Sequence, residues 1–166
     1  MSKTRELILI RHTKSSWDDF SIPDFDRPIK KDRVEDAKNM AVYLKSLKLQ
    51  PDLIICSPAK RTRQTAEYFC DKLKYDIDKI QFDKRIYESS EQDILQVVQE
   101  TDADVKTLVL IGHNPSITHF ANLFIEEKID EMPTTGVAWI EFESPDWEID
   151  RTSRGKLKYF LTPKTI

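Results

Sequence analysis

Three short apolar runs in this chain are each followed within a few residues by basic or imidazole side chains. The runs are residues 7–10, 53–56 and 108–111, and the side chains that follow them are Arg11 and His12, Arg61, and His113. In a parallel sheet the carboxyl ends of the strands share one edge, and the loops at that edge form the ligand crevice. The sequence therefore predicts that two imidazoles and two guanidinium groups converge at one point of the fold.

This combination of groups suits the transfer of a phosphoryl group. Such a site needs fixed positive charge around the equatorial oxygens and a nucleophile in line with the leaving group. Arginine keeps its charge and offers planar, bidentate donors. A neutral histidine can attack phosphorus near pH 7, and water can then hydrolyse the phosphohistidine that forms. We therefore expect an enzyme.

The apolar periodicity predicts the elements that must position these side chains. Strand-like runs alternate with helix-like segments, which indicates an α/β sheet. Helices are expected at residues 31–47, near 60–73, near 91–100 and directly after Pro115, which suits a first helical turn. Residues 137–142 and 157–161 predict an antiparallel strand pair at the sheet edge.

The composition indicates one domain over residues 1–166, with 39% hydrophobic and 33% charged residues. A net charge of −3 argues against an electrostatic nucleic-acid binder. Cys56 and Cys70 are too few for a disulfide framework and predict two buried thiols in a reducing compartment. Because no apolar run is long enough for a signal peptide or a membrane span, we expect a cytoplasmic protein.

The motifs resemble those of a known family. Arg11-His12, the stretch at 57–66 and the stretch at 112–115 are similar, in order and spacing, to motifs of the histidine phosphatase superfamily, which has the phosphoglycerate mutase-like fold. The segments at 11–15, 26–28 and 133–136, together with the short chain, look most like SixA-type phosphohistidine phosphatases. The resemblance implies a three-layer α/β/α fold with a mostly parallel central sheet and an antiparallel edge near the C-terminus.

The resemblance also implies roles for individual residues. It makes His12 the nucleophile that becomes phosphorylated, and it makes Arg11, Arg61 and His113 the phosphate pocket, with His113 donating to a phosphoryl oxygen. No metal or other cofactor belongs to the implied mechanism, and the sequence offers no tight cluster of metal-ligating side chains. Arg63 is expected on the helix surface, because it lies two residues beyond Arg61.

Three further residues are candidates for the site. Glu88, after a short expected strand, resembles the family's acidic residue that protonates the leaving group; the alternative is a solvated acidic loop. An alkoxide leaving group benefits from such an acid, whereas imidazole, with a pKa of about 6.5, can leave already protonated. Lys14 and Ser15 follow the nucleophile and are candidates to bind the phosphate or the leaving group; the alternative for Lys14 is an ordinary surface residue.

Three other features lie beside these motifs. Asp32 stands where the family usually has a glycine that opens a helix, and we predict that it is the N-cap of that helix. His119, in a helical segment, is interpreted as structural. Residues 13–30 form the longest irregular segment and directly follow His12. A long loop in such a place is more often functional, and the alternative is a simple surface loop.

We predict a phosphatase that acts through a covalent phosphohistidine intermediate on phosphohistidine in proteins, such as a histidine phosphotransfer domain, without nucleic-acid or membrane partners. No insertion long enough for a cap domain separates the motifs, and an open pocket suits a side chain on a protein surface. Two alternatives stay open: a small-molecule phosphoester phosphatase of the same fold, and a non-catalytic phosphate- or phosphoprotein-binding module. A mutase is less favoured, because returning the phosphoryl group needs a closed, dry site.

Overall fold

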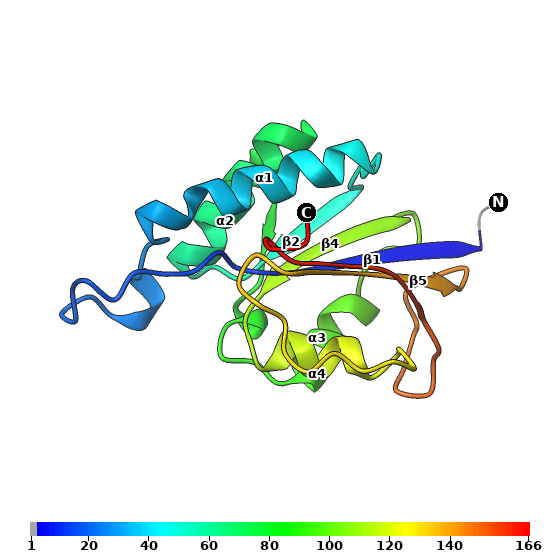
Figure 1. Cartoon of the computed structure of the whole chain (residues 1–166). Coiled ribbons are helices and arrows are strands. Elements are labelled where there is room, and N and C mark those ends of the chain that lie inside the picture. The colour runs from blue at the N-terminus through cyan, green and yellow to red at the C-terminus, as the bar shows by residue number, and fades with distance from the viewer. Residues whose placement is uncertain (1–2) are drawn as a thin grey trace.

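The computed structural model describes residues 3–166, which fold into a sheet between two helical layers (Figure 1). The sheet has six strands in the order β3-β2-β4-β1-β5-β6. The strands are β1 (Thr4–Arg11), β2 (Leu53–Cys56), β3 (Gln81–Phe82), β4 (Thr107–Gly112), β5 (Val137–Glu143) and β6 (Lys156–Leu161). Strands β1 to β4 run parallel to one another, and β5 and β6 are antiparallel to their neighbours. The predicted fold class is confirmed.

Two helices cover each face of the sheet. Helices α1 (Val34–Ser46) and α2 (Lys60–Leu73) lie on one face, and α3 (Glu91–Gln99) and α4 (Ser116–Asn122) lie on the other (Figure 1). All four correspond to the helices expected from the apolar periodicity.

The start of the first helix differs from the prediction. Residues Lys31–Arg33 form a 3-10 turn, and the α-helix begins only at Val34. The prediction that Asp32 is the N-cap is wrong, because Asp32 lies inside this turn and no side chain caps α1. The Asp32 carboxylate instead lies 3.7 Å from Nζ of Lys30.

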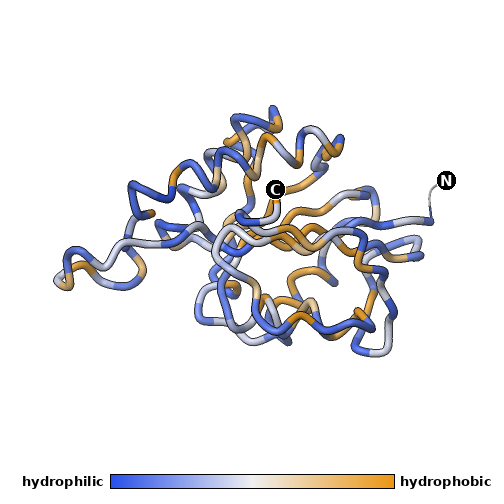
Figure 2. Tube along the Cα trace, in the orientation of Figure 1, coloured by the Kyte–Doolittle hydropathy of each residue, from blue (hydrophilic) through white to orange (hydrophobic). Residues whose placement is uncertain are grey.

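The apolar runs of the sequence form strands that are buried on both faces. Leu7 and Leu9 of β1 pack in the core beneath α3 and α4, whereas Ile8 and Ile10 pack beneath α1 and α2. Successive side chains of a strand point to opposite faces, so a strand between two helical layers must be apolar at every position. Figure 2 shows this apolar colour concentrated in the sheet between the layers.

Both cysteines are buried and free, as the sequence predicted. Burial raises the pKa of the Cys56 thiol and raises that of Cys70 to about 11. Both thiols therefore stay protonated at neutral pH. Within residues 3–166 no helix combines the length and the apolar character needed to cross a membrane.

The register of the central strands brings their carboxyl ends level. Arg11 of β1 pairs with Gly112 of β4, and Cys56 of β2 pairs with Ile111 of β4. The loops that follow these three strands therefore begin at the same edge of the sheet, which is where a parallel sheet binds its ligands.

Candidate active site

His12 and His113 face each other across the adjacent ends of β1 and β4. Their ring centroids are 5.2 Å apart, the rings are tilted by 54°, and each residue is 7% exposed. The backbone N–H of His12 donates to the carbonyl of Gly112 over 3.1 Å, which fixes the two strand ends together. The two imidazoles lie in an open cleft of ≈ 410 Å³, which Arg11 and Arg61 also line. The four side chains therefore converge in one cleft, as the sequence predicted.

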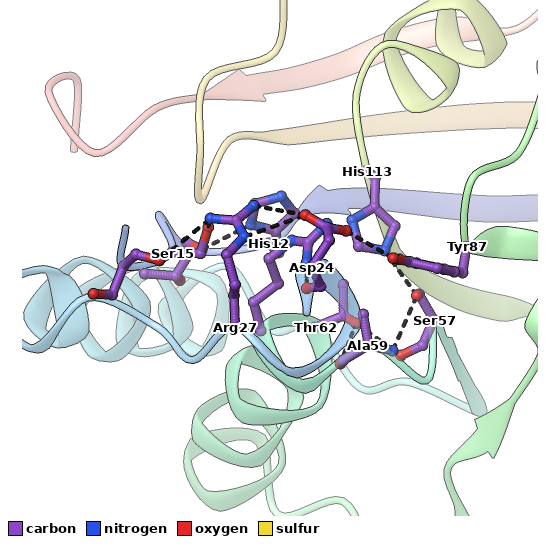
Figure 3. Close-up of polar contacts among 12 residues, drawn as sticks. His12, Ser15, Asp24, Arg27, Ser57, Ala59, Thr62, Tyr87 and His113 are labelled. Atoms are coloured by element: carbon purple, nitrogen blue, oxygen red, sulfur yellow. Dashed lines mark hydrogen bonds and ion pairs between the residues drawn. The ribbon is translucent and has the colours of Figure 1, made fainter. Parts of the chain in front are cut away.

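His12 is held in its neutral form. Its Nδ1 lies 2.7 Å from the carbonyl oxygen of Thr13, and because a carbonyl can only accept, Nδ1 carries the proton and Nε2 keeps its lone pair (Figure 3). Burial lowers the pKa of His12, the bond to Thr13 opposes this, and the charges of His113, Arg61 and Arg11 add to the lowering, so that the pKa is about 3. The ring is therefore unprotonated at Nε2 at neutral pH.

His113 has the complementary arrangement. Its Nε2 lies 2.7 Å from Oγ of Ser57, and that same oxygen accepts from the backbone N–H of Ala59 over 3.3 Å (Figure 3). The Ser57 hydroxyl proton is then available to Nε2, which places the ring proton on Nδ1. Burial and the charge of Arg61 lower the pKa of His113 to about 3, and its buried Nδ1 has no hydrogen-bond partner among residues 3–166.

Arg11 and Arg61 each keep one buried donor unused. Nη1 and Nη2 of Arg61 donate to the carbonyl and the carboxylate of Asp24 over 2.8 and 3.1 Å, while Nη1 of Arg11 donates to the carbonyl of Met132 over 2.8 Å. The Nε atoms of both arginines are buried and have no partner in the described part of the chain. Buried donors without partners are costly in a folded protein.

Asp24 connects three side chains, two of which, Arg27 and Arg61, line the cleft. Its carboxylate accepts from Nη2 of Arg27 over 3.0 Å, from Nη2 of Arg61 over 3.1 Å and from the hydroxyl of Tyr87 over 2.7 Å (Figure 3). Partial burial raises the pKa of Asp24, but the bonds from Tyr87 and Arg27 and the charge of Arg61 outweigh it and hold the pKa at about 2. Burial and Asp24 raise the pKa of Tyr87 to about 12. At neutral pH Asp24 is therefore an anion and Tyr87 is protonated.

The sequence analysis assigned no role to Asp24, Arg27 or Tyr87. Arg27 lies within the segment at 26–28 that resembles SixA-type phosphatases, so this motif was the available signal for the residue. Asp24 and Tyr87 carry no comparable signal, because they are distant in sequence. Along the chain, Asp24 is 37 residues and Tyr87 is 26 residues from Arg61, and the two are 63 residues apart. Only the folded loop brings them together.

Lys14 and Ser15 both line the cleft. Lys14 is exposed, whereas Ser15 is 6% exposed and its Oγ accepts from Nη1 of Arg27 over 2.5 Å. Their binding to a ligand stays a prediction. Arg63 lies on the exposed side of α2 as expected, and His119 is exposed on α4 outside the cleft lining.

Glu88 lies outside the residues that line the cleft. The expectation of a strand directly before it is wrong, because β3 ends at Phe82 and a 3-10 turn over Lys84–Ile86 intervenes. The Asp83 side chain, which accepts from the backbone N–H of Arg85, starts that turn. Glu88 is exposed with φ of 52°, and it is the preceding Tyr87 whose ring packs edge-on against His113 at 5.6 Å. The acid role of Glu88 stays a prediction.

Comparison with known proteins connects this geometry to a family. Residues 7–101 match the sequence model of the histidine phosphatase superfamily (branch 1). The chain belongs to the histidine phosphatase superfamily. A chloroplastic protein of Arabidopsis thaliana, itself described as uncharacterized, is 30% identical over 155 residues, which cover 89% of this chain and 71% of that protein.

Solved structures show the same histidine phosphatase fold. SixA of Agrobacterium tumefaciens is similar with a TM-score of 0.82 and 24% identity, covering 96% of this chain and 98% of that one. The protein histidine phosphatase SixA in complex with tungstate is similar with a TM-score of 0.80 and 18% identity, covering 96% and 97%. At these identities the likeness establishes the fold. Membership of the superfamily makes this chain a phosphatase.

Proposed function

We propose that this phosphatase hydrolyses phosphohistidine in proteins, through a covalent intermediate on His12. One observation supports the choice of substrate: among residues 3–166, the residues that line the cleft include no carboxyl group. Asp24, which is bonded to Arg27 and Arg61 of the lining, is ionised because its pKa is about 2. Glu88, the acid expected from the sequence, is exposed and outside the cleft lining.

The unused donors of the cleft would bind the phosphoryl oxygens. Nε of Arg11, Nε of Arg61 and Nδ1 of His113 are buried and without partners within the described residues, and charged or polarised N–H groups are strong donors to phosphate. Fixed before substrate binds, they would stabilise the charge of the transition state without further reorganisation.

The first chemical step is attack by His12. The lone pair of Nε2 forms a bond to phosphorus while the bond from phosphorus to the substrate imidazole breaks, and the bonding electrons leave with that imidazole, which takes up a proton from solvent. In the second step a water oxygen attacks the phosphorus, the bond to Nε2 breaks and inorganic phosphate is released, with the water proton passing to solvent. His12 returns to its starting state.

The leaving group explains why a missing acid favours this substrate. An alkoxide is a strong base and departs with difficulty unless an acid protonates it. An imidazole, whose conjugate acid has a pKa of about 6.5, leaves readily as a neutral or already protonated ring. The cleft is also open. We propose that the chain has no cap insertion, so that a phosphorylated side chain on a protein surface can enter the cleft.

The test is phosphate release from a histidine-phosphorylated phosphotransfer domain. The wild type is compared with His12→Ala, and His119→Ala serves as the control because His119 is exposed and outside the cleft lining. We expect release by the wild type and by the control, and none by His12→Ala. Activity that survives in His12→Ala would overturn the mechanism. Turnover of a small aryl phosphate alone would move the substrate to phosphoesters, and inactivity on both would favour a binding module.

A further inference from the structure

Residues 13–30, which we call the arm, project from the body of the molecule beside the cleft. In Figure 1 the arm is the blue segment that extends furthest from the sheet. Its base is closed by an antiparallel bridge between Ser15 and Ile29. On either side of this bridge the backbone N–H of Ser16 donates to the carbonyl of Pro28 over 2.9 Å, and that of Lys30 donates to the carbonyl of Lys14 over 2.8 Å.

The arm is braced from inside by one buried arginine. Arg27 is 7% exposed, and its guanidinium donates to Oγ of Ser15 and to the carboxylate of Asp24. The same guanidinium carbon lies 3.5 Å from the ring centroid of Trp17. At the far side of the arm the ring of Phe25 packs edge-on against Tyr87, which belongs to the body, at 5.1 Å. The arm is thus ordered before any ligand binds, which lowers the entropic cost of binding.

Despite this bracing, the arm exposes two large aromatic side chains. Trp17 is 58% exposed and Phe20 is 86% exposed, the two highest values among the large apolar side chains of the described residues. Apolar colour along the projecting segment is visible in Figure 2. Aromatic side chains on an ordered surface, with few internal contacts, are typical of the residues that dominate the energy of protein interfaces.

Acidic side chains lie beside these aromatic rings, and one lies beside an arginine of the cleft. Asp18 and Asp19 lie exposed between the two aromatic residues, and the carboxylate of the exposed Glu131 lies 3.8 Å from Nη1 of Arg11. The floor of the cleft, in contrast, is cationic. A surface that complements both features has an anionic phosphoryl group at its centre and apolar and basic side chains around it.

We propose that the arm is the docking surface for the protein that carries the phosphohistidine, and that this protein is apolar and basic around its phosphorylated side chain. The inference rests on the proposed function. Trp17 belongs to the cleft lining as well as to the arm, whereas Phe20 lies outside the lining. Only a ligand much larger than the cleft can contact both the phosphate pocket and Phe20, so a protein substrate uses the arm and a small phosphoramidate does not.

The experiment compares two substrates of the same chemistry and different size: a histidine-phosphorylated phosphotransfer domain and phosphoimidazole. The variant is Phe20→Ser, and the matched control is Ile77→Ser, because Ile77 is 47% exposed and lies after the far end of α2. We expect Phe20→Ser to raise KM for the phosphorylated domain about 5- to 30-fold, with kcat little changed. Its kcat/KM for phosphoimidazole stays within about twofold of the wild type, and Ile77→Ser matches the wild type on both substrates.

Charge gives an independent measurement on the same surface. Asp18→Asn should raise KM for the phosphorylated domain at low salt, and the difference should shrink as salt is added, because exposed charges are screened. An equal KM for wild type and Phe20→Ser on the domain would overturn the docking role, and so would an equal loss on both substrates, since the arm would then act on the cleft. Sedimentation showing a dimer that Phe20→Ser dissociates would assign the arm to self-association instead.

Failure of the proposed function itself has a different signature. A wild type that cleaves neither phosphoramidate but hydrolyses aryl phosphate would overturn phosphohistidine as the substrate, and the docking role with it. A wild type that cleaves phosphoimidazole but not the phosphorylated domain would leave the chemistry standing and overturn both the protein substrate and the docking role, whereas an equal KM for wild type and Phe20→Ser overturns the docking role alone.

Discussion

The ring centroids of His12 and His113 lie 5.2 Å apart. One nitrogen of each ring is hydrogen-bonded within the protein, that of His12 to an acceptor and that of His113 to a donor. Nδ1 of His12 meets a carbonyl oxygen, which can only accept, and Nε2 of His113 meets the Ser57 hydroxyl, which can donate. The other nitrogen of the first ring therefore keeps a lone pair, and the other nitrogen of the second ring keeps an N–H group. Two neutral imidazoles thus take two different chemical roles because of one hydrogen bond each.

Removing the hydroxyl of Ser57 should weaken the donor on His113. In Ser57→Ala, Nε2 of His113 loses its partner at 2.7 Å, and the ring proton is free to move from Nδ1 to Nε2. We expect kcat for phosphohistidine to fall about 10- to 100-fold, in the range seen when one transition-state donor is lost. Ser57→Thr keeps a hydroxyl and should recover most of the activity. A wild-type kcat in Ser57→Ala would contradict this assignment.

The negative charge of Asp24 should oppose anion binding in the cleft. Its carboxylate lies 3.1 Å from Nη2 of Arg61, so it neutralises part of the charge that Arg61 offers to phosphate. In Asp24→Asn we expect inorganic phosphate, measured as a competitive inhibitor, to bind about 3- to 10-fold more tightly. Asp26→Asn, which changes an exposed acid of the same arm, is the control. Weaker inhibition by phosphate in Asp24→Asn would show that Asp24 acts mainly by orienting Arg61.

Glu88 should matter little for phosphohistidine. Because its side chain is exposed and outside the cleft lining, and because imidazole leaves without an acid, Glu88→Gln should keep kcat/KM for phosphohistidine within about twofold of the wild type. The ratio of activity on phosphohistidine to activity on an alkyl phosphate, measured with and without Glu88, checks this. A loss above about tenfold on phosphohistidine would place Glu88 in the proton-transfer step after all.

The two buried histidines should make the fold sensitive to acid. Both have a pKa of about 3 in the folded state, against about 6.5 in the unfolded chain, so the unfolded chain binds more protons between these values. The free energy of unfolding is therefore highest above pH 6.5 and falls as the pH drops toward 3. Denaturant unfolding across this range measures the slope. In the double variant His12→Gln/His113→Gln the free energy of unfolding should change less with pH. An unchanged dependence on pH would contradict the lowered pKa values of the two histidines.

A glycine in the 133–136 segment should be needed for both stability and activity. A Cβ on Gly136 would lie 2.7 Å from the carbonyl oxygen of Pro133, and the carbonyl of Gly136 accepts from the backbone N–H of Arg11 over 3.0 Å. We expect Gly136→Ala to lose about 1–3 kcal/mol of stability and also to lower kcat, because the nucleophile loop shifts.

Gly155 offers the comparison for this variant. A Cβ there would lie 2.5 Å from a methyl carbon of Ile140, and neither residue belongs to the cleft lining. Gly155→Ala should lose a similar stability in thermal unfolding and keep its kcat at temperatures where it stays folded. Equal kcat values for Gly136→Ala and the wild type would show that the segment does not position the site.

The parts of the fold and site that the sequence predicted are those set by local periodicity and strand ends. Buried strands gave continuous apolar runs, and His12 and His113 follow two of those runs directly, so their meeting was predictable from the shared edge of a parallel sheet. The bond between Asp24 and Arg61 was not predictable, because it depends on the folded conformation of the arm.

Local exceptions to helix and strand rules account for the remaining errors. The 3-10 turn at Lys31–Arg33 displaced the start of α1, so a residue suited to capping did not cap. A second 3-10 turn, at Lys84–Ile86, took the place of a strand and turned Tyr87 rather than Glu88 toward His113. Short turns of this kind carry little periodicity, and sequence reasoning has no reliable signal for them.

The strand order has a consequence for how the protein folds during its synthesis. Strands β1 and β2 are not neighbours in the sheet; β4, the last of the parallel strands along the chain, lies between them. While a ribosome is still making the first hundred or so residues, Arg11 and Arg61 exist but no strand pairing joins β1 to β2. Insertion of β4 joins the two halves and delivers His113 in the same event. The catalyst is therefore completed in a single late assembly step, and chains halted before it have no active form.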